Sequence, residues 1–362
     1  MMKGTRNIGR AILAFALVGA VGFSAIACKT DADGNGGNSG NGGNGGDKEL
    51  TGTVSISPSG TVGLNTYLTA NYDGTETGIT LTYQWKNGTA AIGGATNGNY
   101  YPTEAGSYTV TVSANNYKSI TSVAVNVVAP ETDTATGLIY LKSGDAYILA
   151  GRDKTTHSGD SLTVPDMYKE LPVTGIAARA FLDDQLTEVI LGNKVETIGD
   201  FAFQDNKLAG ELTIPDSVVS IGNGAFEGYG NGIGNNITNN ITKVTLGNNV
   251  ETIGERAFRN NRLAGELTIP DSVVSIGASA FASNTYFRNE LNKVTIGNKV
   301  ETIGEYAFYY NNLTTITIGA NVVISNDDAM GYYGAAFRTL YDVNGKKAGT
   351  YNRPGGTWTL QE

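Results

Sequence analysis

The chain has 362 residues, which is enough for two folded domains and extended ends. It carries 34 acidic and 25 basic residues, a formal net charge of −9, and three of the bases lie in the first ten residues. An acidic chain of this kind repels phosphate backbones, so a nucleic-acid partner is not expected.

The chain contains one cysteine, Cys28, and one histidine, His157. No disulfide within the chain and no zinc site of Cys/His type can form from them. Nucleophilic catalysis with an imidazole base would have to use His157. The sequence also has no nucleotide-binding motif and no acid pair in a singular setting. We therefore expect no metal and no cofactor, and a protein that is not an enzyme.

Residues 1–27 are predicted to be a signal peptide. The first ten residues are basic and residues 11–27 are apolar, and this apolar run is short for a membrane-spanning helix. The run ends in Ser-Ala-Ile-Ala followed by Cys28, which resembles the bacterial lipobox, with Ala25 where that motif usually has Leu. The resemblance implies acylation of Cys28 and an anchor in the bacterial envelope, at the outer membrane or cell surface. The alternative is an ordinary signal peptide with an incidental cysteine.

Residues 28–48 are predicted to be a flexible tether. Their composition is dominated by Gly, Asn, Asp and Ser. A segment with so few apolar side chains cannot bury enough surface to fold.

Residues 49–130 alternate between apolar and polar residues with period two, and turn signals separate the runs. About seven short strands at this spacing predict a β-sandwich. The segment Tyr-Gln-Trp at 83–85 and the segment 104–110 (EAGSYTV) resemble bacterial immunoglobulin-like domains. The resemblance implies that Trp85 is the core tryptophan, that Tyr108 makes a tyrosine corner, and that Val110 stands where many such domains have Cys. We expect a spacer rather than a ligand-binding module.

The dipeptide Ala-Phe occurs seven times in the C-terminal half, with Phe at 181, 203, 226, 258, 281, 308 and 337. The spacings of 22 and 23 residues predict a stack of similar units, and the longer spacings indicate insertions. Residues 207–222 and 262–277 differ only at Lys207 and Arg262, which indicates duplication of a 55-residue block. A solenoid presents an extended surface, so its default function is binding.

Each unit is predicted to begin with a short strand, such as Leu-Thr-Ile at 212–214, that ends at a Gly or Pro. Ile198 and Ala202 are four residues apart, which is the spacing of one helical turn. An Asn close behind the Phe is suited to capping backbone groups at a tight bend. We expect this role for Asn206, Asn260, Asn284 and Asn311.

The repeat I-P-x-x-V-x-x-I-G-x-x-A-F is present in full at 214–226 and at 269–281. It resembles the BspA-like type of leucine-rich repeat found in surface proteins of treponemes and oral anaerobes. The resemblance implies a mostly β chain, in which an immunoglobulin-like β-sandwich precedes a leucine-rich repeat solenoid over 131–362. Residues 138–150 are predicted to be a capping hairpin. Residues 321–362 are predicted to be the opposite cap, with a hairpin turn at Asn344-Gly345.

The predicted strands begin near residues 162, 189, 212, 244, 267, 294 and 316, and all but one have Thr at the central outward position. This threonine column suggests an ordered-water or ice-binding face, but Thr is also a good strand former, and we favour that simpler explanation. The preceding outward position alternates acids and lysines, as in Glu211, Lys243 and Glu266, and these are expected to pair.

Two insertions, after Phe226 and after Phe281, leave the stack at the same edge and are rich in aromatic residues. Insertions of this kind often form the binding surface, and exposed aromatics are typical anchors of interfaces. The predicted ligand-binding residues are Tyr229, Tyr286, Phe287, Tyr306, Tyr309 and Tyr310. The resemblance implies an adhesin for host matrix protein or a partner bacterium. The alternative is an inward-facing structural or interaction lipoprotein of the envelope.

Overall fold

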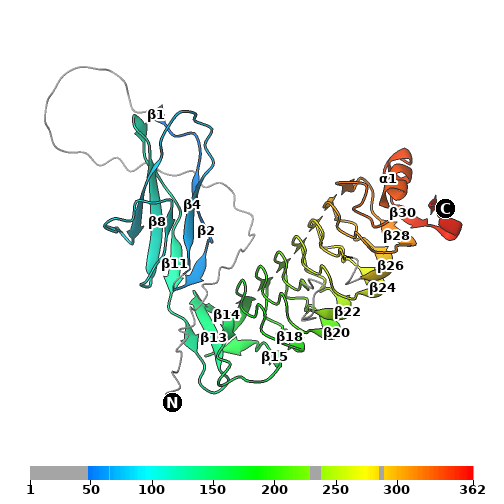
Figure 1. Cartoon of the computed structure of the whole chain (residues 1–362), viewed down its shortest axis with the longest axis horizontal. Helices are drawn as coiled ribbons and strands as arrows, with labels where there is room; N and C mark the ends of the chain where they lie inside the picture. The colour runs from blue at the N-terminus through cyan, green and yellow to red at the C-terminus, as the bar shows by residue number, and fades with distance from the viewer. Residues whose placement is uncertain (1–47, 65, 229–237, 285–288, 362) are drawn as a thin grey trace, which may run out of the picture.

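The computed structural model describes residues 48–64, 66–228, 238–284 and 289–361, and these are mostly β (Figure 1). They contain one α-helix, α1 (Gly334–Val343), and none of their helices is long and apolar enough to cross a membrane. The predicted signal peptide, the tether up to residue 47 and Cys28 lie outside the described residues.

The N-terminal unit consists of two main sheets around one apolar core. The smaller sheet has the strand order β2 (Val54–Ser57), β4 (Leu68–Tyr72), β7 (Asn99–Tyr100). The larger has the order β3 (Thr61–Gly63), β11 (Val125–Val128), β8 (Gly106–Ser113), β5 (Thr82–Asn87), β6 (Ala90–Ala91), with β10 (Ile120–Thr121) on β8. A short parallel pair joins β1 (Lys48–Glu49) to β9 (Tyr117–Lys118).

The core of this unit is built on the residues that the sequence singled out. Trp85 and Val110 are fully buried, and the Trp85 indole N–H donates to the backbone oxygen of Asn97 at 2.9 Å. The buried Tyr108 donates its hydroxyl to the backbone oxygen of Glu104 at 2.9 Å. Both polar atoms are therefore satisfied inside an apolar core, as burial of Trp and Tyr requires.

A hairpin covers the N-terminal end of the repeats. Strand β13 (Leu138–Ser143) pairs antiparallel with β14 (Ala146–Arg152) and with β12 (Glu131–Thr132). Strand β14 then pairs in parallel with β17 (Leu171–Ile176), which also carries β16 (Met167–Tyr168). The Ser143 hydroxyl contacts the Thr61 hydroxyl at 3.1 Å, which joins the hairpin to the N-terminal unit.

Each repeat contributes strands to two rows. The seven strands of the first row lie where the sequence predicted them: β15 (Ser161–Thr163), β18 (Glu188–Ile190), β20 (Ala209–Thr213), β22 (Asn240–Thr245), β24 (Ala264–Thr268), β26 (Glu290–Thr295) and β28 (Thr315–Ile318). Their central threonines are in register, and Lys243 and Lys293 form ion pairs with Glu211 and Glu266 at 3.1 and 2.8 Å.

The second row is the more continuous one. It extends the β14–β17 sheet through two-residue strands without a break: β19 (Thr197–Ile198), β21 (Ser220–Ile221), β23 (Thr252–Ile253), β25 (Ser275–Ile276), β27 (Thr302–Ile303) and β29 (Val323–Ile324). The predicted helical turn from Ile198 to Ala202 is wrong. Ile198 belongs to β19, and Phe201 has a left-handed backbone with φ 57°, which an α-helical turn does not accommodate.

Six phenylalanines form a continuous stack through the core, from Phe181 to Phe308. Neighbouring ring centres are 5.2–5.4 Å apart, and their planes lie within 10° of parallel. All six side chains are almost completely buried. The stack therefore supplies a large apolar contact between each pair of successive repeats.

A ladder of buried asparagines runs beside the phenylalanines. Asn261 is typical, because its side-chain oxygen accepts the Ile241 N–H and its amide donates to the backbone oxygens of Phe226 and Phe258 at 2.9 and 3.1 Å. The other members make the same kind of contacts and are at most 1 % exposed: Asn206, Asn239, Asn289 and Asn311. Each Asn thus satisfies backbone groups of neighbouring repeats.

The sequence predicted only part of this ladder. Asn206 and Asn311 are correct. Asn260 is wrong by one position, because it lies beside the ladder in a left-handed conformation with φ 56°. After Phe281, where an insertion follows, the ladder position is filled by Asn289.

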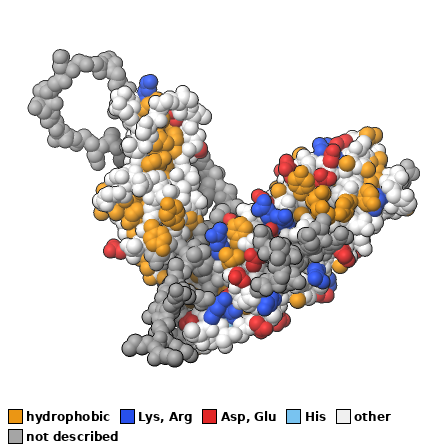
Figure 2. All heavy atoms as spheres, viewed as in Figure 1, with side chains coloured by type: hydrophobic (Ala, Val, Ile, Leu, Met, Phe, Trp, Pro, Cys, Tyr) orange, Lys and Arg blue, Asp and Glu red, His pale blue; other side chains and the backbone are white. Residues whose placement is uncertain are grey.

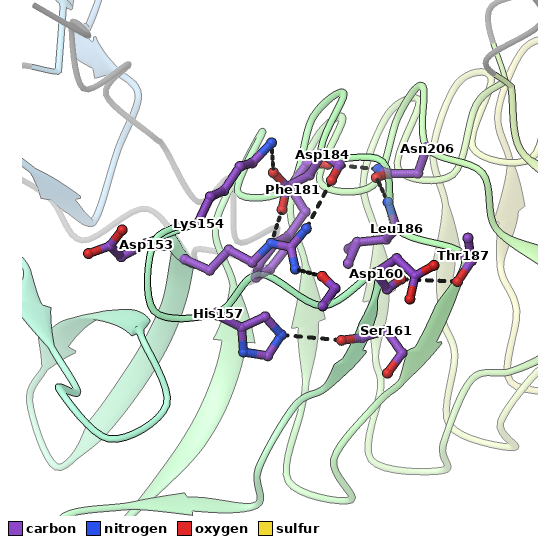
Figure 3. A network of polar contacts seen from close by, with 12 residues as sticks. Asp153, Lys154, His157, Asp160, Ser161, Phe181, Asp184, Leu186, Thr187 and Asn206 are labelled. Atoms are coloured by element: carbon purple, nitrogen blue, oxygen red, sulfur yellow. Dashed lines mark hydrogen bonds and ion pairs between the residues drawn. The ribbon is translucent and has the colours of Figure 1, made fainter.

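The ladder position of the first repeat holds an aspartate, Asp184, three residues after Phe181 (Figure 3). A carboxylate cannot donate hydrogen bonds, and this one is 7 % exposed. Arg152 of the capping hairpin donates to the Asp184 side chain at 2.5 Å and to its backbone oxygen at 2.9 Å, and Lys154 also contacts the carboxylate. The cap therefore closes the ladder with a buried charge pair.

The C-terminal cap differs from the prediction. The seventh Ala-Phe copy is not a repeat, because Phe337 lies in α1. The equivalent turn is occupied by Ala329-Met330, and the Phe308 N–H donates to the backbone oxygen of Ala329 there. Asn344-Gly345 does not form a hairpin turn, since it follows the end of α1. The hairpin lies later, between β30 (Gly349–Asn352) and β31 (Thr359–Leu360), and β30 pairs antiparallel with β28.

Replacing Asn261 with Ala removes three buried hydrogen bonds and leaves the Ile241 N–H without its partner. We expect the free energy of unfolding to fall by about 3 kcal/mol, from the cost of unsatisfied buried groups. Urea denaturation measures the change, with Asn298→Ala at an exposed position as the matched control. Equal stability of the two variants would contradict the ladder's role.

Candidate functional site

The turn that carries each phenylalanine contains left-handed residues. The residue two positions before the Phe has φ between 56° and 59° in every described copy: Arg179, Phe201, Gly224, Arg256, Ser279 and Tyr306. The residue two positions after it is also left-handed in several copies: Asp183, Asp205, Asn260 and Tyr310. Gly and Asn adopt this conformation readily, whereas bulky side chains do so at a cost.

The sixth repeat places tyrosine at both of these left-handed positions. Tyr306 has φ 59° and Tyr310 has φ 64°, and a third tyrosine, Tyr309, lies between them. The cost of a bulky residue in this conformation is about 1–2 kcal/mol per residue. Such strain is often found at functional sites, and the feature that distinguishes this turn is an aromatic side chain at both left-handed positions.

The tyrosines form one cluster with Tyr332 of the next turn, which we call the tyrosine cluster (Tyr306, Tyr309, Tyr310, Tyr332 and Tyr333). The Tyr309 and Tyr310 ring centres are 4.5 Å apart, and Tyr310 and Tyr332 are 5.2 Å apart, both edge to face. Tyr306, Tyr332 and Tyr333 remain 40–53 % exposed. Figure 2 shows hydrophobic side chains, a class that includes tyrosine, gathered over the C-terminal repeats.

A groove of about 600 Å³ runs along the cluster. Aromatic rings form one part of its lining and amide or carboxylate side chains form the rest: Tyr310, Tyr332, Tyr333, Asn289, Glu290, Asn292 and Asn312. Rings supply apolar contact at a small entropic cost, and amides supply both donors and acceptors. The groove is therefore suited to a polar surface with apolar anchors.

The cap holds part of this groove in place. The guanidinium carbon of Arg353 lies 3.4 Å from the centre of the Tyr333 ring, and the Trp358 indole N–H donates to the Tyr333 backbone oxygen at 3.1 Å. A cation stacked on an aromatic face stabilises the ring's position. Burial raises the pKa of Tyr309 above its ordinary value.

The structure brings together three of the predicted ligand-binding residues, Tyr306, Tyr309 and Tyr310. The other three, Tyr229, Tyr286 and Phe287, and the lipidation residue Cys28 lie outside the described residues. No local pattern in the sequence indicates the contact of Arg353 with Tyr333, because the two residues are 20 positions apart.

The structure also places the residues that metal binding or catalysis by an imidazole would need. In the part of the chain that the structure describes, no group of three or more His, Cys, Asp or Glu side chains is placed to hold a metal ion. The ring nitrogens of His157 lie 3.1 and 3.2 Å from the backbone oxygens of Thr136 and Ser161. His157 thus ties two loops of the N-terminal cap together.

The short parallel strands, the phenylalanine stack and the asparagine ladder define a leucine-rich repeat solenoid. The family model for the BspA type leucine rich repeat region matches residues 174–233 and 233–333, with six copies. These residues therefore form a BspA-type leucine-rich repeat region, as the sequence motif predicted.

Two solved structures resemble the chain. A leucine-rich repeat protein from Bacteroides ovatus is 28 % identical with a TM-score of 0.41, over 52 % of this chain and 48 % of that one, so the match spans about half of that protein's length. A leucine rich cell surface protein from Faecalibacterium prausnitzii is 18 % identical with a TM-score of 0.26, over 54 % of this chain and 78 % of that one. Among curated proteins none matches significantly.

Replacing Tyr306 with Asn relieves the left-handed strain. We expect the free energy of unfolding to rise by about 0.5–1 kcal/mol, because Asn tolerates this conformation. Tyr332→Asn is the control, since Tyr332 is also exposed and contacts neighbouring rings but is not left-handed. Thermal unfolding of both variants tests the idea, and a gain at Tyr332 equal to that at Tyr306 would count against strain as the cause.

Proposed function

We propose that this protein is a lipid-anchored binding protein of the bacterial envelope, an adhesin whose repeat region binds a protein of the host matrix or of a partner bacterium. The observation that carries the proposal is the tyrosine cluster, in which the left-handed Tyr310 lines a groove together with Tyr332 and Tyr333. Exposed tyrosines with rigid neighbours are favoured anchors of protein interfaces.

The geometry supports binding rather than catalysis. The cluster combines aromatic faces with neutral amides, and the only charged side chain in the groove lining is Glu290. Acid–base catalysis uses an acid and a base that have different pKa values. This lining contains one carboxylate and neither a second acid nor an imidazole. The protein is therefore proposed not to be an enzyme and to need no cofactor.

The N-terminal unit is proposed to be an immunoglobulin-like spacer. The buried Trp85 and the bond from Tyr108 to the Glu104 backbone support this assignment. In this arrangement, the spacer and the residues before it would hold the repeat region away from the membrane. Tyr229, Tyr286 and Phe287, which lie outside the described residues, are also proposed to take part in binding.

Loss of the tyrosine cluster should abolish binding while leaving the fold intact. We expect the triple variant Tyr306→Asn, Tyr310→Asn, Tyr332→Ser to bind at least tenfold more weakly, a change of about 1.4 kcal/mol. Surface plasmon resonance against purified matrix proteins, and adhesion to cells of other bacteria, provide the measurements. The control replaces the exposed Tyr67 and Tyr101 of the N-terminal unit with Ser. Unchanged binding by the triple variant would remove this site.

Acylation of Cys28 is tested separately. We expect labelled fatty acid to be incorporated into the wild-type protein and not into Cys28→Ala, because the thiol is the acylation site in the motif that residues 24–28 resemble. Labelling that persists in Cys28→Ala would exclude this anchor. Protease treatment of intact cells then distinguishes a surface adhesin, which is digested, from an inward-facing envelope protein, which is protected.

A further inference from the structure

The first strand row is interrupted at two equivalent places. Strands pair within the groups β15–β18, β20–β22 and β24–β26–β28, whereas β18 does not pair with β20 and β22 does not pair with β24. The second row continues through the same repeats without a break. The interruptions are therefore local openings of the solenoid on one side.

The residue two positions after each strand's central outward residue decides where the openings occur. In chain order these residues are Pro165, Gly192, Pro215, Gly247, Pro270, Gly297 and Gly319. Every junction whose second repeat has Gly is paired, and both junctions whose second repeat has Pro are open. A Pro/Gly alternation in the sequence thus sets the pairing.

The physical reason is close approach. A Cβ atom added at Gly192, Gly247 or Gly297 would lie 2.8, 2.3 or 2.3 Å from a backbone oxygen of the preceding repeat. Only glycine fits against its neighbour at this distance. Proline brings a ring to the same place, which does not fit at this distance. Pro215 and Pro270 therefore mark the two junctions at which β20 does not pair with β18 and β24 does not pair with β22.

A slot of about 860 Å³, which is within the size range of ligand sites, lies at the junction of Pro215. At its upstream end the repeats are joined, since the Lys207 N–H donates to Leu186 at 2.8 Å. From Glu188 onward, no backbone hydrogen bond joins β18 to β20 in the described part of the chain. Each strand therefore presents an edge without its usual ladder partner.

The slot has an apolar interior and an acidic rim. Its lining includes Leu191, Leu208, Leu212, Ile214 and Leu246, and Ile190 at its mouth is 54 % exposed. The charged lining residues are all acidic: Glu188, Glu211 and Asp216. Glu211 is already paired with Lys243, so Glu188 and Asp216 are the carboxylates that give the rim its attraction for cations.

We propose that this slot docks an extended segment of a partner protein, with apolar side chains in the slot and Lys or Arg beside them. The unpaired strand edges offer main-chain donors and acceptors, which an extended peptide matches by strand addition. The acidic rim selects a segment with basic residues. This site is separate from the tyrosine cluster and does not depend on the proposed function.

Peptides displayed on phage provide the probe. A random 12-residue library is selected on the solubilised wild-type protein, and the enriched peptides are measured by fluorescence anisotropy. We expect enriched peptides to alternate apolar residues with Lys or Arg. We also expect binding to weaken at least tenfold in two variants. Pro215→Gly lets β20 approach β18 and closes the slot, and Ile190→Lys places a cation at the mouth.

The matched control is Pro270→Gly, which changes the equivalent proline at the second opening and should leave peptide binding unchanged. Tyr306→Asn should also bind the peptides normally, which separates this site from the tyrosine cluster. Hydrogen exchange adds a readout that needs no peptide, because pairing of β18 with β20 in Pro215→Gly should raise the protection of the amides of these two strands. The proposal fails if no library peptide depends on Ile190, if acidic peptides are enriched, or if Pro215→Gly binds as the wild type does.

Discussion

The repeat region depends on one constraint: each repeat must satisfy its backbone groups and bury its apolar side against the next one. The phenylalanine rings set this contact, with centres 5.2–5.4 Å apart. Beside them the buried asparagines bond to backbone atoms of neighbouring repeats, which no apolar residue could do. A repeat without a neighbour would expose both features, so the two ends need caps.

The caps meet the same need in different ways. At the N-terminal end, Asp184 occupies the ladder position and Arg152 supplies the donors that its carboxylate lacks. At the C-terminal end, Met330 replaces the phenylalanine, and α1 and β30 cover the last strands. A buried ion pair at one end and a helix at the other thus satisfy and cover the groups that a further repeat would contact. In both cases the residues depart from the repeat pattern because their partners are no longer repeats.

The surfaces proposed for binding are also departures from the pattern. Tyr310 stands at a left-handed position where three other repeats have Asp or Asn. Pro215 lies between repeats that have Gly192 and Gly247 at the equivalent position, and its junction is one of the two without strand pairing. Since the stack itself remains intact, these positions are free to serve a ligand. The regular repeats supply the rigid frame that holds them.

Much of the repeat region could be predicted from the sequence, because its spacing and alternation are local features. The seven first-row strands lie where the pattern placed them, and the motif at 214–226 indicated the family that matches residues 174–333. The errors fall where a long-range partner decides. After Phe281 the ladder position is filled by Asn289, because an insertion follows that phenylalanine.

The sequence by itself determined the repeat, its period and the residues that fill its core, since a regular pattern of apolar side chains requires a regular stack. Only the tertiary structure decided which asparagines join the ladder and which tyrosines meet. Asn344-Gly345 and Phe337 show why: each carries a valid local signal, yet both belong to the helical cap that packs on the last repeat. Contacts between residues distant in the chain overrode those signals.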